Sequence, residues 1–356
     1  MRRHAEPGIQ SPGETQDRGE SMMKTVLRLF SRSCLVGVVL LALPLSQGIA
    51  AEKIRIATAG LAASSAAVWA ALETKTFQKH GLEVEYIIID NGTVGGQALL
   101  AGELQVLVST GALAITANLK GGDLTIIGGI INFIPFQLIS RPEIKTAEDL
   151  KGKKVAISRF GSASDFAVRE ALKKLRLDPA GDAGLIQVGG QSARYAALAQ
   201  NAVQAAVFNE PLSTLAVKKQ KMNLLADLAN LDLPFPNTDY IVRREYLQTH
   251  RAQAVNFMKA VIEGMRVIKA NRTLGIRSIQ KYLKMNDAEE AGIAYDYYVG
   301  QHMGEIPDVP SRAALSAGID QIVAKKDSVT PESLKLVDRS VLEEIIQSGF
   351  VNALYK

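Results

Sequence analysis

The chain of 356 residues contains a single cysteine, Cys34. One cysteine cannot form an intrachain disulfide, and it cannot supply the thiolate set of a structural zinc or iron–sulfur site. The four histidines are scattered, and none lies in a loop that follows a predicted strand: His4, His80, His250 and His302. The sequence therefore indicates neither a metal centre nor histidine-based catalysis, and no cofactor is expected.

Aromatic residues are also scarce, at 6% of the chain with one tryptophan, whereas hydrophobic residues make up 47%. Such a composition, rich in alanine, valine, isoleucine and leucine, fits an α/β protein with a substantial core. The sequence lacks a Gly-x-Ser-x-Gly elbow, a phosphate-binding loop and a dinucleotide fingerprint. It also lacks a long run of lysine and arginine, and its net charge is only +5. No nucleic-acid partner is therefore expected.

The N-terminal region carries a targeting signal. A basic segment at residues 24–32 precedes an apolar run at residues 34–45, and small residues follow at 48–51. This order is typical of a secretory signal peptide, and we expect cleavage after Ala50 or Ala51. An uncleaved membrane anchor is the alternative, which the short apolar run disfavours.

Export would deliver the chain to the periplasm. Residues 1–21 show no pattern and are expected to lie upstream of the true start, so residues 1–51 are interpreted as an extension plus signal peptide. Cys34 lies inside that segment and is not preceded by the Leu-x-x-Cys arrangement of bacterial lipid attachment. The processed chain is thus expected to have no thiol and to diffuse freely.

Short apolar strands alternate with helices in two successive series. The first series predicts strands near residues 53–57, 82–89, 105–109 and 124–131, and helices near 64–79, 93–101 and 111–120. The second predicts strands near 154–158, 185–188, 204–208 and 222–226, and helices near 162–176, 191–200 and 211–220. Continuous apolar strands favour parallel sheets that are covered on both faces. The sequence therefore predicts an α/β fold of two lobes, each a mostly parallel sheet flanked by helices.

The remainder of the chain is predicted to be mainly helical. Two prolines at residues 233–237 predict a stiff turn, which leads into a returning strand near 239–242. One-sided apolar patterns then predict helices near 255–270, 274–284, 287–299, 311–325 and 339–347. These helices are expected to pack back on the first lobe.

Small or polar residues follow the strands of both series, and a helix begins directly behind them. The unpaired N–H groups of helix starts, gathered at the carboxyl ends of parallel strands, favour a small polar or anionic ligand. The candidate ligand-binding residues of the first series are Thr58, Ala59, Gly60, Gly92, Thr93, Ser109, Thr110 and Asn132. Those of the second series are Phe160, Gly161, Ser162, Ser164, Gln191, Ser192, Asn209 and Glu210. No residue is assigned a catalytic role or a metal.

Two of these candidates also have a purely structural interpretation. Ser162 is placed to cap a helix, and Glu210, directly before Pro211, would stabilise a helix start. If Glu210 faces the crevice instead, it would hold an amine or another hydrogen-bonding group of the ligand. That second possibility disfavours a bare inorganic anion.

Three further residues are better explained without a ligand. Trp69 lies one turn into the first predicted helix, where a large aromatic side chain usually belongs to the core. Arg159 and Arg194 lie close to the strand ends of the second series and have the chemistry to pair with an anion. We expect both arginines to lie on the solvated surface.

Three segments carry a resemblance to a known family: QALLAGEL at residues 97–104, RPEIKTAEDLKGKKV at 141–155 and SRFGSASD at 158–165. With residues 77–84 and 236–238, they resemble the nitrate/sulfonate/taurine-type solute-binding proteins of ABC importers. The resemblance implies a two-lobed periplasmic-binding-protein fold of the second type. It implies that residues 52–138 and 240–356 form lobe 1 and residues 139–239 form lobe 2. Two hinge crossings are expected near 137–142 and 238–243.

The resemblance also implies a function. A small polar or anionic organic solute, of sulfonate, taurine or nitrate type, would be captured between the lobes and delivered to a membrane permease. A monomer without enzymatic activity is expected. Two alternatives remain open on the same fold: an enzyme similar to the thiamin-pyrimidine synthases, and an extracytoplasmic ligand sensor. The synthases need a particular histidine and a cysteine-rich iron-binding stretch, and no such constellation is recognised here.

Overall fold

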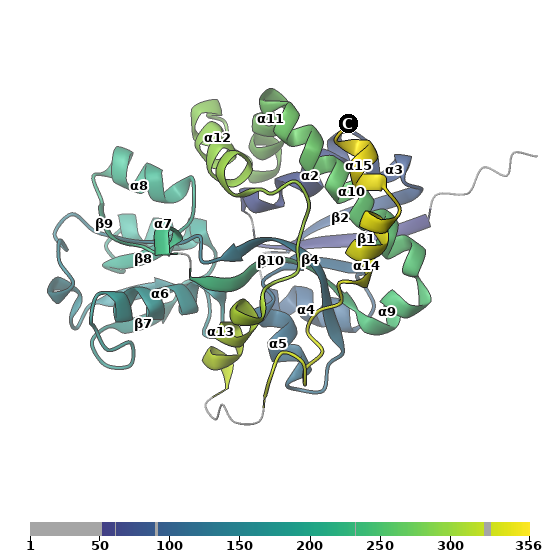
Figure 1. Ribbon diagram of the computed structural model, residues 1–356. Coiled ribbons are helices and arrows are strands. Elements are labelled where there is room, and N and C mark those ends of the chain that lie inside the picture. Colours follow the sequence, from purple (N-terminus) through teal and green to yellow (C-terminus); the bar gives the residue numbers. More distant parts are fainter. Residues whose placement is uncertain (1–51, 61, 90–91, 232, 324–328) are drawn as a thin grey trace, which may run out of the picture. The chain divides into compact units, whose positions relative to one another are not determined.

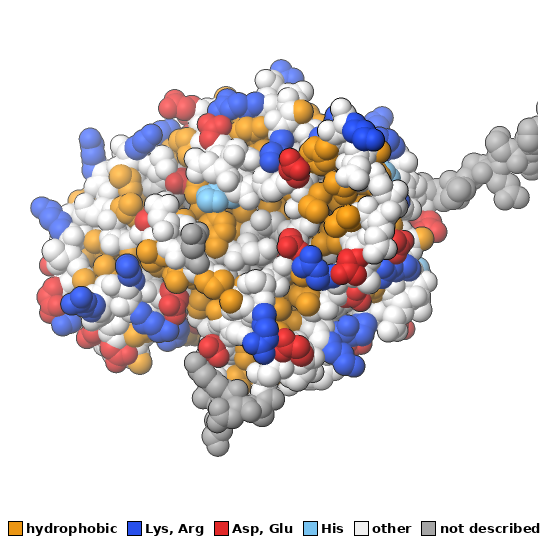
Figure 2. Space-filling view, viewed as in Figure 1, with side chains coloured by type: hydrophobic (Ala, Val, Ile, Leu, Met, Phe, Trp, Pro, Cys, Tyr) orange, Lys and Arg blue, Asp and Glu red, His pale blue; other side chains and the backbone are white. Residues whose placement is uncertain are grey.

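The computed structural model describes residues 52–60, 62–89, 92–231, 233–323 and 329–356. The expected signal peptide and its cleavage site lie outside the described residues. Within them, no helix combines the length and the hydropathy that crossing a membrane requires. Figure 2 shows lysine and arginine side chains interspersed with aspartate and glutamate on the face in view.

In the described part of the chain, ten strands form two five-stranded sheets of the same design (Figure 1). The first sheet has the order β2-β1-β3-β10-β4 and comprises β1 (Glu52–Ala59), β2 (Leu82–Ile89), β3 (Val106–Ser109), β4 (Leu124–Phe133) and β10 (Pro234–Arg243). The second has the order β7-β6-β8-β5-β9 and comprises β5 (Gln137–Ser140), β6 (Lys154–Ile157), β7 (Gly184–Gln187), β8 (Ala205–Phe208) and β9 (Asn223–Asp227).

Each sheet contains one strand that runs against the other four. In the first sheet β10 pairs antiparallel with β3 and β4, and in the second β5 pairs antiparallel with β8 and β9. Both reversed strands are the ones that the chain forms on entering from the other sheet, since β5 follows β4 and β10 follows β9. The predicted fold class, two mostly parallel sheets flanked by helices and joined by two crossings, is confirmed.

Helices cover both faces of the first sheet. The helices α2 (Ala66–Glu73), α10 (Arg251–Ala270), α11 (Arg272–Leu283) and α12 (Ala288–Tyr295) share one apolar cluster with Ile54 and Ile56 of β1. On the other face α4 (Gly92–Leu100), α5 (Ala112–Asn118) and α13 (Arg312–Ile322) pack around Ala57 and Leu107. Adjacent residues of β1 are therefore buried on opposite faces, as expected for a covered parallel sheet.

The second sheet is covered in the same way. The helix α6 (Ala163–Lys174) packs on one face, around Val155 and Val207. The helices α7 (Gln191–Ala199) and α8 (Leu212–Gln220) pack on the other, around Ala206 and Phe208. The remaining α-helices of the described residues are α3 (Thr76–Lys79), α9 (Arg244–Thr249), α14 (Ser340–Gln347) and α15 (Phe350–Leu354), with a π-helical turn η5 (Asp296–His302) after α12.

Some local predictions were wrong. The helix expected at 64–79 consists of a 3₁₀ turn η2 (Ala63–Ser65), α2 and α3 (Thr76–Lys79). The helices α2 and α3 are separate because Lys75 between them has a left-handed backbone with φ 56°. The stiff turn expected at 233–237 belongs largely to β10, whose register shifts between Pro234 and Thr238. Proline has no N–H for a regular ladder and is tolerated at such irregular positions.

The strand β5 was expected only as a crossing segment. It has four residues, of which Leu138, Ile139 and Ser140 are fully buried. The expected lobe boundaries at residues 138/139 and 239/240 fall inside β5 and β10. The division into lobes by these boundaries stays a prediction. We use "first lobe" and "second lobe" below for the parts built on the first and second sheets.

Candidate functional site

Strand ends of both sheets line one pocket of about 590 Å³, which we call the central pocket. Its volume lies in the range typical of sites for small organic molecules. Twelve of the sixteen predicted residues line it: Thr58, Ala59, Gly60, Gly92, Ser109, Thr110, Ser162, Ser164, Gln191, Ser192, Asn209 and Glu210. The repeated arrangement of strand, polar loop and helix start therefore brings residues that are far apart in the sequence to one cavity.

The first-lobe wall is built on the end of β1. Thr58 is 2% exposed, and its hydroxyl accepts a hydrogen bond of 2.7 Å from the phenol of Tyr86 on β2. Tyr86 in turn accepts a 2.7 Å hydrogen bond from the indole nitrogen of Trp69. Trp69 is fully buried, so its predicted place in the core is confirmed. A chain of hydrogen-bonded side chains, Trp69–Tyr86–Thr58, thus supports this wall on the side away from the pocket.

Two further first-lobe residues are tied to the crossing strand β10. The hydroxyl of Thr110 donates to the carbonyl of Pro236 at 2.7 Å. The hydroxyl of Thr238 donates to Ser64 Oγ at 3.1 Å. These bonds connect the pocket wall to the strand that returns from the second lobe.

Three serine hydroxyls form a compact cluster at the start of α6. Ser158 Oγ lies 2.9 Å from Ser162 Oγ and 2.8 Å from Ser164 Oγ, and Ser162 and Ser164 are 2.9 Å apart. Ser162 donates its only hydrogen to the carbonyl of Arg159, and Ser158 donates to Ser162. Ser164 contacts both other hydroxyls without a fixed donor, so the cluster can accept a hydrogen bond from a solute and Ser164 can also donate one.

Ser162 also caps α6. Its Oγ accepts the backbone N–H of Asp165 at 3.3 Å, and Asp165 accepts the N–H of Gly161 at 2.8 Å. This reciprocal arrangement follows the capping-box principle with aspartate in place of glutamate. The structural interpretation of Ser162 is therefore correct, and its place on the pocket wall adds to it.

Acceptor groups also dominate the wall at the end of β8. Glu210 is 8% exposed, and its carboxylate accepts from the N–H and the hydroxyl of Thr214, at 3.2 and 2.9 Å. Asn209 is 6% exposed, and its Oδ1 has no hydrogen-bond partner among the described residues. Gln191 Oε1 accepts the N–H of Asn209 at 3.0 Å. A solute that donates hydrogen bonds would satisfy these oxygens.

Arg194 corrects a prediction, because it is buried rather than solvated. It is 2% exposed, and its guanidinium donates to the carbonyls of Gly189 and Val207 at 2.8 to 3.3 Å. Burial lowers the pKa of Arg194 to about 10, so it remains charged at neutral pH. It lines the central pocket and has no carboxylate partner among the described residues. Arg159, by contrast, is exposed as expected.

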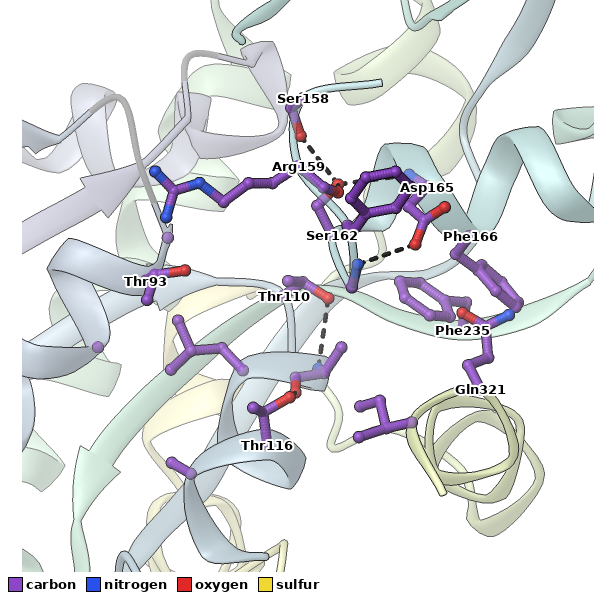
Figure 3. A pocket seen from close by; sticks show the side chains of 18 of the residues that line it. Thr93, Thr110, Thr116, Ser158, Arg159, Ser162, Asp165, Phe166, Phe235 and Gln321 are labelled. Carbon is purple, nitrogen blue, oxygen red and sulfur yellow. Dashed lines mark hydrogen bonds between the residues drawn. The ribbon is translucent and has the colours of Figure 1, made fainter. Parts of the chain in front are cut away.

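A second cavity of about 1260 Å³ adjoins the central pocket, and we call it the outer groove (Figure 3). The two share Gly92, Thr110, Ser158, Ser162 and Gly190. The predicted residues Thr93, Phe160 and Gly161 line only the outer groove. Its floor includes Phe166 and Phe235, whose rings stack with centroids 4.3 Å apart. In Figure 3 the Arg159 side chain extends toward the side that carries Thr93.

Asn132 is the one predicted residue that lines neither cavity. The sequence predicts a strand that ends at residue 131, which would leave Asn132 in the loop behind it. However, β4 extends to Phe133, which pairs with Pro234 of β10. Asn132 is thus part of the strand rather than of a loop at its mouth.

Several residues that line the central pocket were not among the candidates. Ser64 and Ser65 follow β1 as polar residues at a helix start, so the same pattern could have identified them. Asn237 lay in the turn that was wrongly predicted at 233–237, and Thr238 lay directly after it. Leu283, Met285 and Glu290 come from the end of α11 and from α12. No local signal marks them, because only packing of the C-terminal helices brings them to the pocket.

Comparison with known proteins places the chain among binding proteins. A family model described as NMT1/THI5 like matches residues 62–272. A Brucella abortus protein that is named provisionally as a binding protein is 30% identical over 227 residues, which are 61% of this chain and 67% of that protein.

Solved structures share the fold. The alkanesulfonate-binding protein SsuA from Xanthomonas axonopodis pv. citri, bound to MOPS, has a TM-score of 0.66 at 17% identity and covers 80% of this chain and 98% of its own. The periplasmic nitrate-binding protein NrtA from Synechocystis has a TM-score of 0.68 at 14% identity and covers 83% and 88%. The resemblance stated from sequence is confirmed.

Proposed function

Because the chain belongs to the NMT1/THI5-like family, we propose that it is a periplasmic solute-binding protein that delivers a small polar organic solute to an ABC importer. The observation that carries this proposal is the central pocket, lined by strand ends and helix starts of both sheets. Open α/β sheets bind ligands at this edge. Closure of the lobes about the two crossings would then hold the solute.

Export supports the same role. The N-terminal segment reads as a secretory signal, and the structurally similar nitrate-binding protein is described as periplasmic. The similar sulfonate- and nitrate-binding proteins also suggest an anionic group on the solute. The permease would be a transient partner, and the protein would act as a monomer without enzymatic activity.

The pocket wall of the second lobe narrows the solute class further. The carboxylate of Glu210 and Asn209 Oδ1 present acceptors. Nitrate has no hydrogen to donate, and it would leave these oxygens unsatisfied or repelled. We therefore favour an organic solute that carries an amine or another donor group in addition to any anionic group.

The test compares taurine with ethanesulfonate, which lacks only the amine of taurine, and includes nitrate as an inorganic anion that has no hydrogen to donate. A ligand that binds only the folded state raises the melting temperature, so a thermal-shift titration of the purified full chain ranks the three. Taurine should bind more tightly than ethanesulfonate, and Glu210→Gln should weaken taurine about tenfold or more, because a charge-assisted hydrogen bond is lost.

Glu343→Gln serves as the control, since Glu343 is exposed on α14 and away from the pocket. Equal binding of all three probes by wild type and Glu210→Gln would contradict the donor requirement. Turnover of pyridoxal phosphate in the presence of iron, with no thermal shift by any probe, would favour the synthase-like alternative over transport.

A further inference from the structure

The polar chain behind Thr58 has a fixed direction. An indole N–H can only donate, so the Trp69–Tyr86 hydrogen bond of 2.7 Å makes the Tyr86 phenol an acceptor. The phenol has one hydrogen, and the 2.7 Å bond to Thr58 Oγ1 uses it. Thr58 must therefore accept from Tyr86, and its own hydroxyl hydrogen is left to donate elsewhere. No further hydrogen bond of the Thr58 side chain exists among the described residues.

The surroundings hold this chain in one arrangement. The Trp69 ring stacks on Tyr282 with centroids 5.1 Å apart and an interplanar angle of 8°. Tyr86 meets the same Tyr282 ring edge-on at 5.7 Å. The hydroxyl of Tyr282 donates to Glu73 at 3.0 Å, which fixes the third ring in turn. Burial raises the pKa of Tyr86, so the phenol keeps its hydrogen at neutral pH.

The same elements also form the pocket wall. Ser64 and Ser65 lie directly before α2, which carries Trp69, and Leu283 follows Tyr282 at the end of α11. Thr58 itself lines the pocket and is 2% exposed. The hydrogen that Thr58 has left is therefore available where a solute would lie.

We propose that Tyr86 is a positioning residue that sets Thr58 as a hydrogen-bond donor, so that the first-lobe wall selects a solute with an acceptor oxygen at that place. This inference rests on the proposed function and deepens it. The second-lobe wall presents acceptors and the first-lobe wall presents a fixed donor. The expected solute therefore carries hydrogen-bond acceptors at one end, toward Thr58, and hydrogen-bond donors at the other end, toward Asn209 and Glu210.

The first arm of the test needs no ligand. Trp69 is the only tryptophan, so the full chain labelled with ¹⁵N-tryptophan gives one indole N–H signal. A buried, hydrogen-bonded indole should appear downfield and exchange slowly with water. Tyr86→Phe should move the signal upfield and speed its exchange, whereas Tyr246→Phe, whose hydroxyl bonds Gln253, should leave it in place. An unmoved signal in Tyr86→Phe overturns the proposal.

The second arm measures binding of taurine and ethanesulfonate, both of which carry acceptor oxygens. Thr58→Ser keeps the donor and should bind within about twofold of wild type. Thr58→Val, which is nearly isosteric, should bind about tenfold more weakly, because one hydrogen bond is lost and an acceptor is left unsatisfied. Tyr86→Phe should bind about threefold more weakly, since the chain no longer polarises or orients Thr58.

The outcomes separate the two proposals. Equal binding by wild type, Thr58→Val and Tyr86→Phe overturns the positioning role while leaving solute binding intact. If neither probe binds wild type, the proposed solute class fails and the donor role of Thr58 fails with it, whereas the indole signal still tests the Trp69–Tyr86 bond. If Tyr86→Phe does not fold, Thr58→Ser and Thr58→Val still test the donor at Thr58, because they leave the Trp69–Tyr86 bond in place.

Discussion

The stability of the fold depends on individual buried polar groups, and Asp239 is a clear case. It lies on β10 between β3 and β4, opposite Ser109 and Gly129, and it is fully buried. One carboxyl oxygen accepts the N–H of Gly111 at 2.9 Å, and the other has no partner among the described residues. Burial raises the pKa of Asp239 well above its usual value. The group is therefore stable in the fold chiefly as the neutral acid.

The sign of the resulting pH dependence follows from linkage. A carboxyl whose pKa is raised on folding contributes its stability in full below the pKa of the unfolded chain, about 3.9. That contribution is lost as the pH rises toward the folded-state pKa. The asparagine of Asp239→Asn cannot ionise. At pH 8 the free energy of unfolding of this variant should therefore exceed that of wild type by about 1 kcal/mol or more, and the difference should shrink toward pH 4.

Urea titrations at several pH values measure this difference. Glu83→Gln, an exposed residue of β2, is the matched control and should show no such trend. Parallel pH profiles of wild type and Asp239→Asn would mean that Asp239 is ionised in the fold.

At the scale of elements, close helix packing positions the first-lobe wall. The helices α2 and α10 pack closely at Gly264, where an added Cβ atom would clash with the carbonyl oxygen of Ala67. No side chain other than hydrogen fits there without moving the backbone. Since α2 is preceded by Ser64 and Ser65, a displacement of α2 would also move the pocket wall.

Gly264→Ala should lower the free energy of unfolding by about 1–2 kcal/mol, because overpacking outweighs the better helix propensity of alanine. Gly300→Ala is the control, since a Cβ atom there meets no atom within 4 Å. It should be neutral or slightly stabilising. Chemical denaturation measures both variants, and an equal effect of the two would show that α2 can shift without penalty.

At the scale of the whole molecule, ion pairs join the two lobes beside the pocket. Lys219 on α8 pairs with Glu290 of α12 and lies 3.6 Å from Asp287, the residue that caps α12. Glu290 also lines the central pocket. The lysine side chain is 53% exposed, so these pairs are screened by solvent and salt. If the lobes close as proposed, these pairs are suited to adjust the balance between the open and closed forms rather than to fix it.

Lys219→Ala should therefore weaken taurine binding by no more than about threefold at low salt, chiefly through faster dissociation. The difference from wild type should disappear near 1 M salt, where screening is nearly complete. Stopped-flow dissociation at two salt concentrations measures it. Lys173→Ala, which removes an exposed pair with Glu170 on α6, is the control. A loss that persists at high salt would contradict an electrostatic role of Lys219.

The sequence by itself determined the two series of strands and helices, and with them the fold class. It also determined which strand ends could meet, so that twelve of the sixteen candidates line one pocket. These features depend on local hydrophobic pattern and on residues adjacent in the chain, such as Ser162 and its helix.

Only the tertiary structure decided the direction and burial of the polar groups. It buried Arg194 against two carbonyls, placed Asn132 inside a strand, and brought Leu283 and Glu290 to the pocket. It also joined Trp69, Tyr86 and Thr58 into one directed chain. Such contacts join residues from different elements, and no local pattern records them, because they arise only when the sheets and the C-terminal helices pack together.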